Sequence, residues 1–189
     1  MLDEIETWIA GHFDTAALGG PWPAGELGPR RHLYAIIDAS RQPMMIPAAL
    51  EAIASRVSCL YSGNALREFG DNAAWVVELL PSESTLHWLL QQGFNKRWAI
   101  FASSRLELAP FVRHLKKFTV VNNERGETLF FRFYDPHVLR QYLPMFDDQQ
   151  TTSFFRGIDD VFFEDTSREN TIVKFSLSDE SRLTKTAVM

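Results

Sequence analysis

The stretch from Leu129 to Pro144, LFFRFYDPHVLRQYLP, constrains the fold most, because its hydrophobic period changes in the middle. Its first six residues alternate as a strand does, and Arg132 shares one strand face with two aromatic residues. Asp135 and Pro136 then end the strand and begin a helix, because Asp is a favourable N-cap and Pro fits the first helical position. The stretch therefore predicts a strand, a tight corner and a helix that ends near Pro144.

Arg132 has two interpretations at this corner. It stands between Phe130 and Tyr134 on the predicted strand face, a spacing that suits a structural cation–π stack beneath the helix. The same spacing could display the guanidinium group to a partner, since Arg and Tyr are frequent anchors of protein interfaces. Cation–π pairs are common in ordinary cores and surfaces, so the sequence favours the stack.

Apolar strands alternate with helical patterns before this stretch. Strands are predicted at residues 32–38, 57–61, 74–80 and 97–103, each followed by a helix. The short turn NERGE then joins a fifth strand, 118–122, to the strand at 129–134, which forces an antiparallel hairpin. The predicted fold class is α/β, with a mixed β-sheet and flanking helices. Parallel strand–helix units are followed by the hairpin and by a small C-terminal helical and strand extension.

Several residues mark the expected helix ends. Gly93 suits the position just after a helix, and Ser104 with Glu107 has the spacing of a capping box. Pro110 falls inside the helix that this box would begin, so we expect a kink or a delayed start there. As an N-cap, Asp135 should contribute about 0.5–2 kcal/mol, and its replacement by Asn should be mild because Asn also caps helices.

The chain divides into three parts by composition. Residues 1–31 predict a short N-terminal helix, with residues 5, 8 and 9 on its apolar side, and then an irregular arm rich in Gly and Pro. Residues 32–165 hold the strands and helices of the main domain. Residues 166–189 predict a C-terminal strand and a polar tail that frays.

The composition indicates a folded domain and argues against nucleic-acid binding. Of 189 residues, 46% are hydrophobic and 13% aromatic, which supports a large core and excludes global disorder. The net charge of −5 argues against nucleic acid as a partner, because phosphate binding needs a clustered basic surface. Nine basic and four acidic residues lie between Gln92 and Arg140, whereas one basic and six acidic residues lie between Gln141 and Asp165. This asymmetry suits polar protein contacts or two solvated faces.

Cysteine usage and the N-terminus point to the cytoplasm. Cys59 is the only cysteine, so an intramolecular disulfide is impossible and a reducing compartment fits. The N-terminal segment MLDEIETWIAGHF is acidic and lacks the apolar core of a signal peptide. No window approaches the roughly 20 apolar residues of a membrane span. We therefore expect a cytoplasmic chain with no membrane partner.

A search for catalytic groups gives no convergent set. No two of the five histidines are three or four residues apart, and the sequence has no G-x-S-x-G elbow, phosphate loop or dinucleotide motif. Cys59 lies inside an apolar strand, where a small buried residue is the ordinary interpretation. We predict no catalytic residue, metal or cofactor. The alternative is a small α/β enzyme whose site lies at the strand ends near Ser62–Asn64 and Arg132–Asp135.

Seven segments occur in a characteristic order: YAIIDA, CLYSG, AWVVEL, RWAIFASS, LKKFTVV, FFRFYDPHVL and FFRGID. Together they resemble the type VI secretion effector-chaperone family, also called adaptor (Tap or TEC) proteins, over roughly residues 32–165. CLYSG and FFRFYDP are the most specific of these segments. The resemblance implies a non-enzymatic protein that binds a toxic effector in the cytoplasm. It also implies that the protein helps to load this effector onto the VgrG spike protein.

The candidate partner-binding residues surround the strand–helix corner: Arg132, Tyr134, His137 and Arg140. Two alternatives remain open, since Tyr134 could be buried and Arg132 could serve the stack alone. Arg140 is predicted on the exposed side of its helix, so reversing its charge should spare the fold. If these residues make no contact, the acidic segment from Asp147 to Asp165 is the next candidate face.

Overall fold

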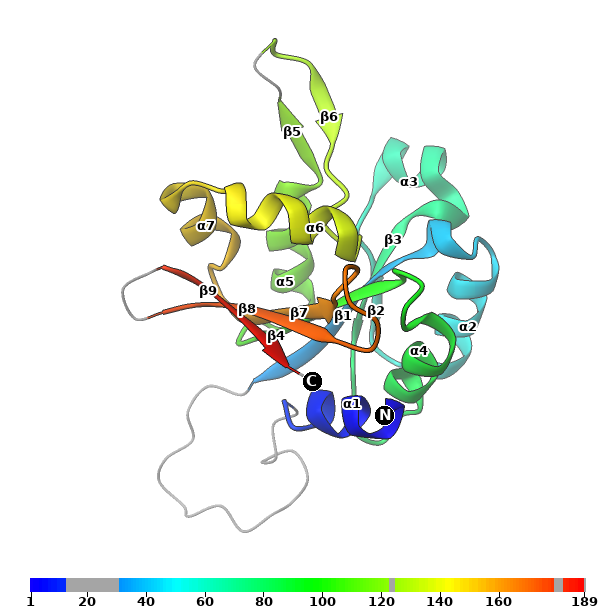
Figure 1. The fold of residues 1–189 in the computed structure, drawn as a ribbon. Coiled ribbons are helices and arrows are strands. Elements are labelled where there is room, and N and C mark those ends of the chain that lie inside the picture. The colour runs from blue at the N-terminus through cyan, green and yellow to red at the C-terminus, as the bar shows by residue number, and fades with distance from the viewer. Residues whose placement is uncertain (13–30, 123–124, 179–181, 189) are drawn as a thin grey trace, which may run out of the picture.

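The computed structural model describes residues 1–12, 31–122, 125–178 and 182–188 (Figure 1). Helix α1 (Leu2–Ala10) forms as predicted and buries Ile5 and Ile9. Most of the predicted irregular arm, residues 14–30, lies outside the described residues.

Within the described residues, seven strands form one sheet in the order β2-β3-β1-β4-β7-β8-β9 (Figure 1). Every neighbouring pair in this sheet is antiparallel. The strands are β1 (His32–Asp38), β2 (Val57–Cys59), β3 (Ala74–Glu78), β4 (Ala99–Ser104), β7 (Ile158–Glu164), β8 (Ile172–Leu177) and β9 (Leu183–Val188).

The predicted parallel strand–helix units are wrong. Strand β1 pairs antiparallel with both β3 and β4, and β2 pairs antiparallel with β3. Strands β1 and β2 therefore run in the same direction, as do β3 and β4, but a strand of opposite direction separates each couple. A helical connection is long enough to skip a strand position, so alternating strands and helices do not decide which strands become neighbours.

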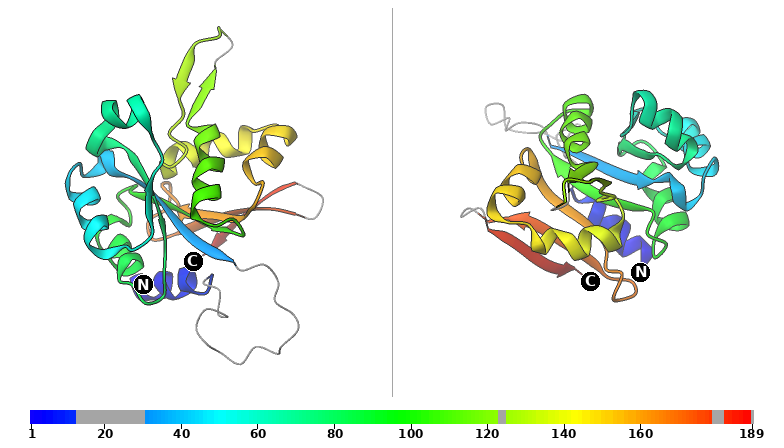
Figure 2. Two further views of the ribbon diagram at one scale, coloured as in Figure 1. Left: turned by 180° about the vertical axis from the view of Figure 1, so that it is seen from behind. Right: turned by 90° about the horizontal axis from the view of Figure 1, so that it is seen from above.

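Helices cover both faces of the sheet, which gives two hydrophobic cores (Figure 2). The bounds are α2 (Met45–Ile53), α3 (Gly63–Phe69), α4 (Thr85–Gly93), α5 (Leu108–Leu115), α6 (Pro136–Tyr142) and α7 (Asp148–Phe154), with short 3₁₀ turns η2 (Ala39–Arg41), η3 (Gly70–Asn72), η4 (Lys116–Phe118) and η5 (Leu143–Met145). Helices α1, α2 and α4 pack on one face, and α5, α6 and α7 on the other. Strand β1 is buried along its whole length, as its continuous apolar run predicts.

The predicted antiparallel hairpin is confirmed but stands apart from the main sheet. Strands β5 (Val120–Asn122) and β6 (Thr128–Phe130) pair only with each other within the described chain and project from the body (Figure 1). The strand expected to reach Tyr134 ends at Phe130, where the chain leaves the hairpin and turns into the core.

Two expectations about chain ends and caps fail. The described part of the polar tail expected to fray forms β9, an edge strand whose four middle residues are all exposed. Ser104 and Glu107 form no capping box, because the Ser104 hydroxyl accepts the Leu106 N–H instead. The delayed start is confirmed: α5 begins at Leu108, so Pro110 falls in the first turn, where its missing N–H is tolerated.

Candidate functional site

The strand–helix corner forms where the sequence predicts it. The Asp135 carboxylate accepts the His137 backbone N–H at 2.9 Å, and Pro136 occupies the start of α6. Tyr134 is 3% exposed, and its hydroxyl lies 2.9 Å from that of Tyr61 after β2. Burial raises the pKa of the Tyr134 phenol, so the hydroxyl stays protonated and holds the corner against the sheet.

Three arginines form ion pairs with two buried carboxylates at this corner. We name these five residues the corner cluster: Asp38, Arg41, Arg97, Arg132 and Asp135. The Asp135 carboxylate lies 2.6 Å from Arg41 Nη2 and 2.5 Å from Arg97 Nη2. Arg132 pairs with Asp38 at the end of β1. The cluster therefore ties the corner to the end of β1 and to the turn before β4.

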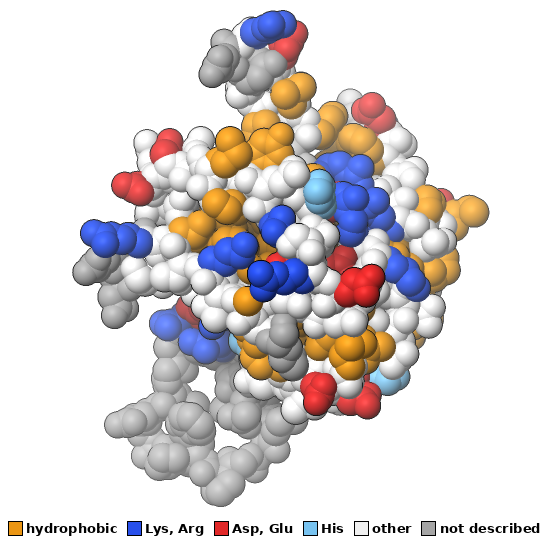
Figure 3. Space-filling model, viewed as in Figure 1, with side chains coloured by type: hydrophobic (Ala, Val, Ile, Leu, Met, Phe, Trp, Pro, Cys, Tyr) orange, Lys and Arg blue, Asp and Glu red, His pale blue; other side chains and the backbone are white. Residues whose placement is uncertain are grey.

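The corner cluster holds three arginines and two carboxylates, so it carries a surplus of positive charge. Burial alone would raise the pKa of Asp135, but hydrogen bonds from Arg97 and the His137 N–H, with the charge of Arg41, hold this pKa below its usual value. The side chains of Arg97 and Arg132 are 38% and 43% exposed. Basic side chains accordingly gather in the middle of this face, with acidic ones between them (Figure 3).

The far end of the corner is held by a further ion pair. Arg140 Nε lies 2.8 Å from the Asp165 carboxylate, and Arg140 Nη2 donates to Ser167 at 2.7 Å. The His137 ring lies beside Thr166, the residue between Asp165 and Ser167. Arg140 is half-buried instead of standing on a free helix face. Reversing its charge would set two carboxylates together, so the expectation that this change spares the fold loses its basis.

All four predicted partner-binding residues lie at the corner, but their exposure differs. Arg132, His137 and Arg140 reach the surface in part, whereas Tyr134 is buried. The predicted stack is replaced by the ion pair of Arg132 with Asp38. Phe130 packs against Phe69 of α3 instead, with ring centroids 4.9 Å apart.

Asp38, Arg41 and Arg97 were not identified from the sequence. A usable signal exists, because Asp38 ends a buried strand and Arg97 precedes another. The end of a strand and the start of its antiparallel neighbour lie side by side, at the same end of the strands. The parallel arrangement expected from the sequence would have placed Asp38 and Arg97 at opposite ends of the strands.

An exposed apolar surface adjoins the corner. Six large apolar side chains on the hairpin, α6 and η5 are between 41% and 74% exposed: Val120, Val121, Leu129, Phe130, Tyr142 and Met145. Between the hairpin and α6–α7 lies a groove of about 370 Å³, which we name the apolar groove; its lining is Phe118, Val121, Phe131, Tyr142, Phe146, Gln149, Gln150 and Ser153. Hydrophobic side chains are visible at the surface beneath the hairpin (Figure 3). Exposed apolar patches of this kind mark interaction sites.

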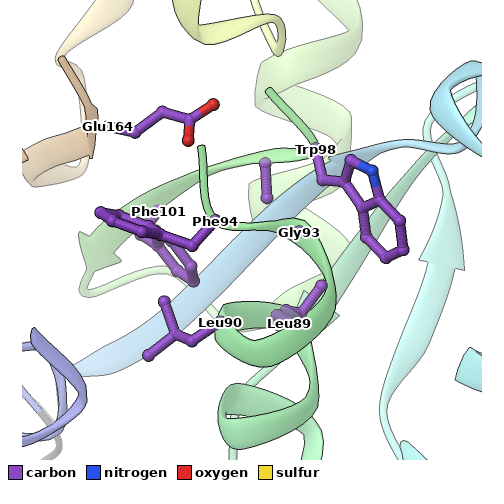
Figure 4. Close-up of a pocket in the computed structure, with 8 residues that line it drawn as sticks. Leu89, Leu90, Gly93, Phe94, Trp98, Phe101 and Glu164 are labelled. Atoms are coloured by element: carbon purple, nitrogen blue, oxygen red, sulfur yellow. The ribbon is translucent and has the colours of Figure 1, made fainter. Parts of the chain in front are cut away.

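A second, much smaller pocket lies between α4 and β4 (Figure 4). It measures about 10 Å³, room for about one water molecule, so it is a packing feature and no ligand site. Glu164 lines it beside Leu90 and Phe101, and its carboxylate accepts the Arg97 backbone N–H. Burial raises the pKa of Glu164 to about 7.

The described residues offer little to metal or thiol chemistry. No group of three or more His, Cys, Asp or Glu side chains among them is placed to hold a metal ion. Cys59 is half-buried, and burial raises the pKa of its thiol, whereas nucleophilic cysteines have lowered pKa values. None of the described helices is long and apolar enough to cross a membrane.

An antiparallel sheet with helices on both faces, an ionic corner and an exposed apolar groove define an α/β domain with a surface suited to protein contact. Residues 33–153 match the family model described as Domain of unknown function (DUF4123). This match covers well over half of the chain, so the chain belongs to that family, which is the type VI secretion effector chaperone or adaptor family. The resemblance noted in the sequence is thereby confirmed. No curated protein and no solved structure matched the chain.

Proposed function

We propose that this chain is a non-enzymatic adaptor that binds one toxic effector in the bacterial cytoplasm and helps to load it onto the VgrG spike protein. Membership in a family of type VI secretion adaptors supports this proposal. The observation that carries it is the exposed apolar surface of the hairpin, set beside the arginines of the corner cluster. Apolar anchors with a charged rim are the usual composition of a specific protein interface.

The two surfaces would supply different parts of the binding energy. Large apolar side chains at the hairpin would lose contact with water, which is the main favourable contribution to association. Arg132, His137 and Arg140 would form the polar rim, and Tyr134 would position them from below. A stable interface buries on the order of 800 Å² per partner, so the groove and the corner would have to act together.

The alternative is a small enzyme with a site at the strand ends near Ser62–Asn64 and at this corner. Arg132 and Asp135, its candidate residues there, are both engaged in ion pairs. The Ser40 hydroxyl also donates a hydrogen bond to Asp38, so the polar groups of the corner are bound to one another. We expect the purified protein to hydrolyse neither nucleotides, esters nor peptidoglycan. Turnover that disappears in Arg132→Ala or Asp135→Ala would contradict the proposed function.

Co-expression with a candidate toxin, chosen from the genes that flank the one for this chain, tests the binding role. The wild-type chain should co-purify with this toxin, whereas Arg132→Gln should weaken the complex about tenfold, as loss of an interface arginine does. The matched control is Arg105→Gln, because Arg105 is also an exposed arginine, at 54%, and forms an ion pair of its own with Asp159. Absence of any complex with the wild-type chain would overturn the proposal, provided that both proteins are folded by circular dichroism.

A further inference from the structure

We propose that the apolar groove receives an amphipathic helix of the effector. This inference rests on the proposed function and assigns one surface of the chain to one kind of partner segment. It concerns the groove between the hairpin and α6–α7, beyond the four corner residues identified from the sequence.

The hairpin presents a different apolar residue pair on each face. Val121 pairs across the ladder with Leu129, and Val120 pairs with Phe130. Cross-strand partners lie on the same face of a sheet, so one face carries Val121 and Leu129 and the other carries Val120 and Phe130. Val121 lines the groove, whereas Phe130 packs against Phe69 of α3. Only the first face therefore belongs to the groove.

Aromatic rings join the two sides of the groove. Phe131 follows the hairpin directly and lies 5.7 Å from Tyr142 and 6.2 Å from Phe146, measured between ring centroids. Tyr142 remains 49% exposed despite this contact. Gln149, Gln150 and Ser153 of α7 add hydrogen-bonding groups to the lining. The groove is thus apolar on both sides and bordered by polar groups, as binding sites for helices are.

The short strands of the hairpin favour a helix over an added strand as the segment that occupies the groove. Strands β5 and β6 have three residues each, so either edge could offer only a few backbone hydrogen bonds to an extended segment. A helix needs no backbone partner, and its apolar stripe at positions i, i+3, i+4 and i+7 would enter a groove with two apolar walls.

Charges beside the lining describe the partner further. Exposed Lys117 precedes Phe118, on the hairpin side. Exposed Asp147 and Asp148 follow Phe146, on the α7 side. The complementary helix carries acidic residues along one border of its apolar stripe and basic residues along the other.

Three helices of a second copy of this chain are poor occupants of the groove. The apolar sides of α1, α4 and α5 already pack in the two cores. These described helices therefore have no free apolar stripe to insert into the groove of another copy.

Synthetic 20-residue peptides that tile the co-expressed toxin test this assignment by fluorescence anisotropy. We expect one amphipathic peptide to bind and to gain helical circular dichroism on binding. Val121→Asp should weaken this binding about tenfold or more, as loss of an interface anchor does. Met45→Asp is the matched control: it places the same charge on an apolar side chain that is also 41% exposed, at the start of α2 on the other face of the sheet, and should change binding less than about threefold. Tyr142→Ser probes the other wall should Val121→Asp disturb the hairpin.

Three results would overturn the inference. One is equal binding by wild type, Val121→Asp and Tyr142→Ser while the whole toxin still co-purifies, which would leave the proposed function intact. Another is a bound peptide that gains no helical signal. The third is a wild-type homodimer in analytical ultracentrifugation that Val121→Asp disperses, since the groove would then join two copies of this chain. Failure of the wild-type chain to bind the whole toxin would instead count against the proposed function.

Discussion

At the scale of single residues, Asp135 performs two tasks with one carboxylate. It caps α6 through the His137 N–H and binds the guanidinium groups of Arg41 and Arg97. Asn would keep the cap but lose the charge, so Asp135→Asn should lower the free energy of unfolding by about 1–3 kcal/mol. This exceeds the mild effect expected from capping alone. Urea unfolding of both proteins provides the measurement.

Asp147→Asn is the matched control for this change. Asp147 caps α7 through the Gln150 N–H and is exposed. Because the retained cap is its main interaction, we expect a change within about 0.5 kcal/mol. Equal effects of Asp135→Asn and Asp147→Asn would show that the arginines of the corner cluster add no stability.

The raised pKa of Glu164 predicts that its contribution to folding stability falls as the pH rises, the opposite of what most carboxylates do. Burial raises its pKa from an ordinary 4.5 to about 7, with Asp135 adding to the rise and the N–H groups of Arg97 and Asn95 opposing it. The folded state therefore holds this proton more tightly than the unfolded chain does. The resulting stability is fully present below about pH 4.5 and is lost as the pH rises through about 7.

Glu164→Gln isolates this contribution. Urea unfolding at about pH 5 and about pH 8 should show the stability of the wild type falling relative to the variant as the pH rises. Exposed Glu169→Gln should track the wild type at both pH values. A pH-independent difference between wild type and Glu164→Gln would refute the raised pKa.

At the scale of elements, Gly93 fixes how closely α4 approaches β4. It lies in the last turn of the helix, not just after it as the sequence suggested, and a Cβ there would come within 2.8 Å of the Trp98 side chain. Gly93→Ala should therefore destabilise the protein by about 1–3 kcal/mol through overpacking. Exposed Gln92→Ala, one residue earlier, should be nearly neutral in the same thermal unfolding experiment. Similar melting temperatures for both variants would mean that the helix shifts without penalty.

Local pattern predicted elements well because their causes are local. The change of period at residues 129–144 gave the corner, its cap and α6, since each depends on neighbouring residues alone. Pro110 likewise delayed α5. The strand order escaped prediction because helical connections skip strand positions, and no local pattern records which strand fills the gap.

The candidate site, like the fold, was predictable only where it depends on residues that are close in sequence. Tyr134, His137 and Arg140 could be placed at one corner because they share a short stretch. The ion pair of Arg132 with Asp38 spans 94 residues of sequence, and that of Arg97 with Asp135 spans 38. Such pairs follow from the antiparallel sheet, which the sequence did not reveal. The groove likewise needs η4, the hairpin and α7 in one place.

At the scale of the whole molecule, the two faces of the sheet are covered differently. One face is closed by α1, α2 and α4. The other carries the corner cluster, the hairpin and the groove, where charged and apolar groups remain exposed. If this second face binds the effector, the first can serve as a rigid support. Backbone protection on binding should therefore be confined to one side of the molecule.

Hydrogen–deuterium exchange on the complex with the co-purified toxin tests this account most directly. We predict slower amide exchange at residues 118–122 and 129–146 when the toxin is bound, with little change in α1, α2 and α4. Absence of a complex, or protection confined to α1, α2 and α4, would contradict the assignment of this face to effector binding.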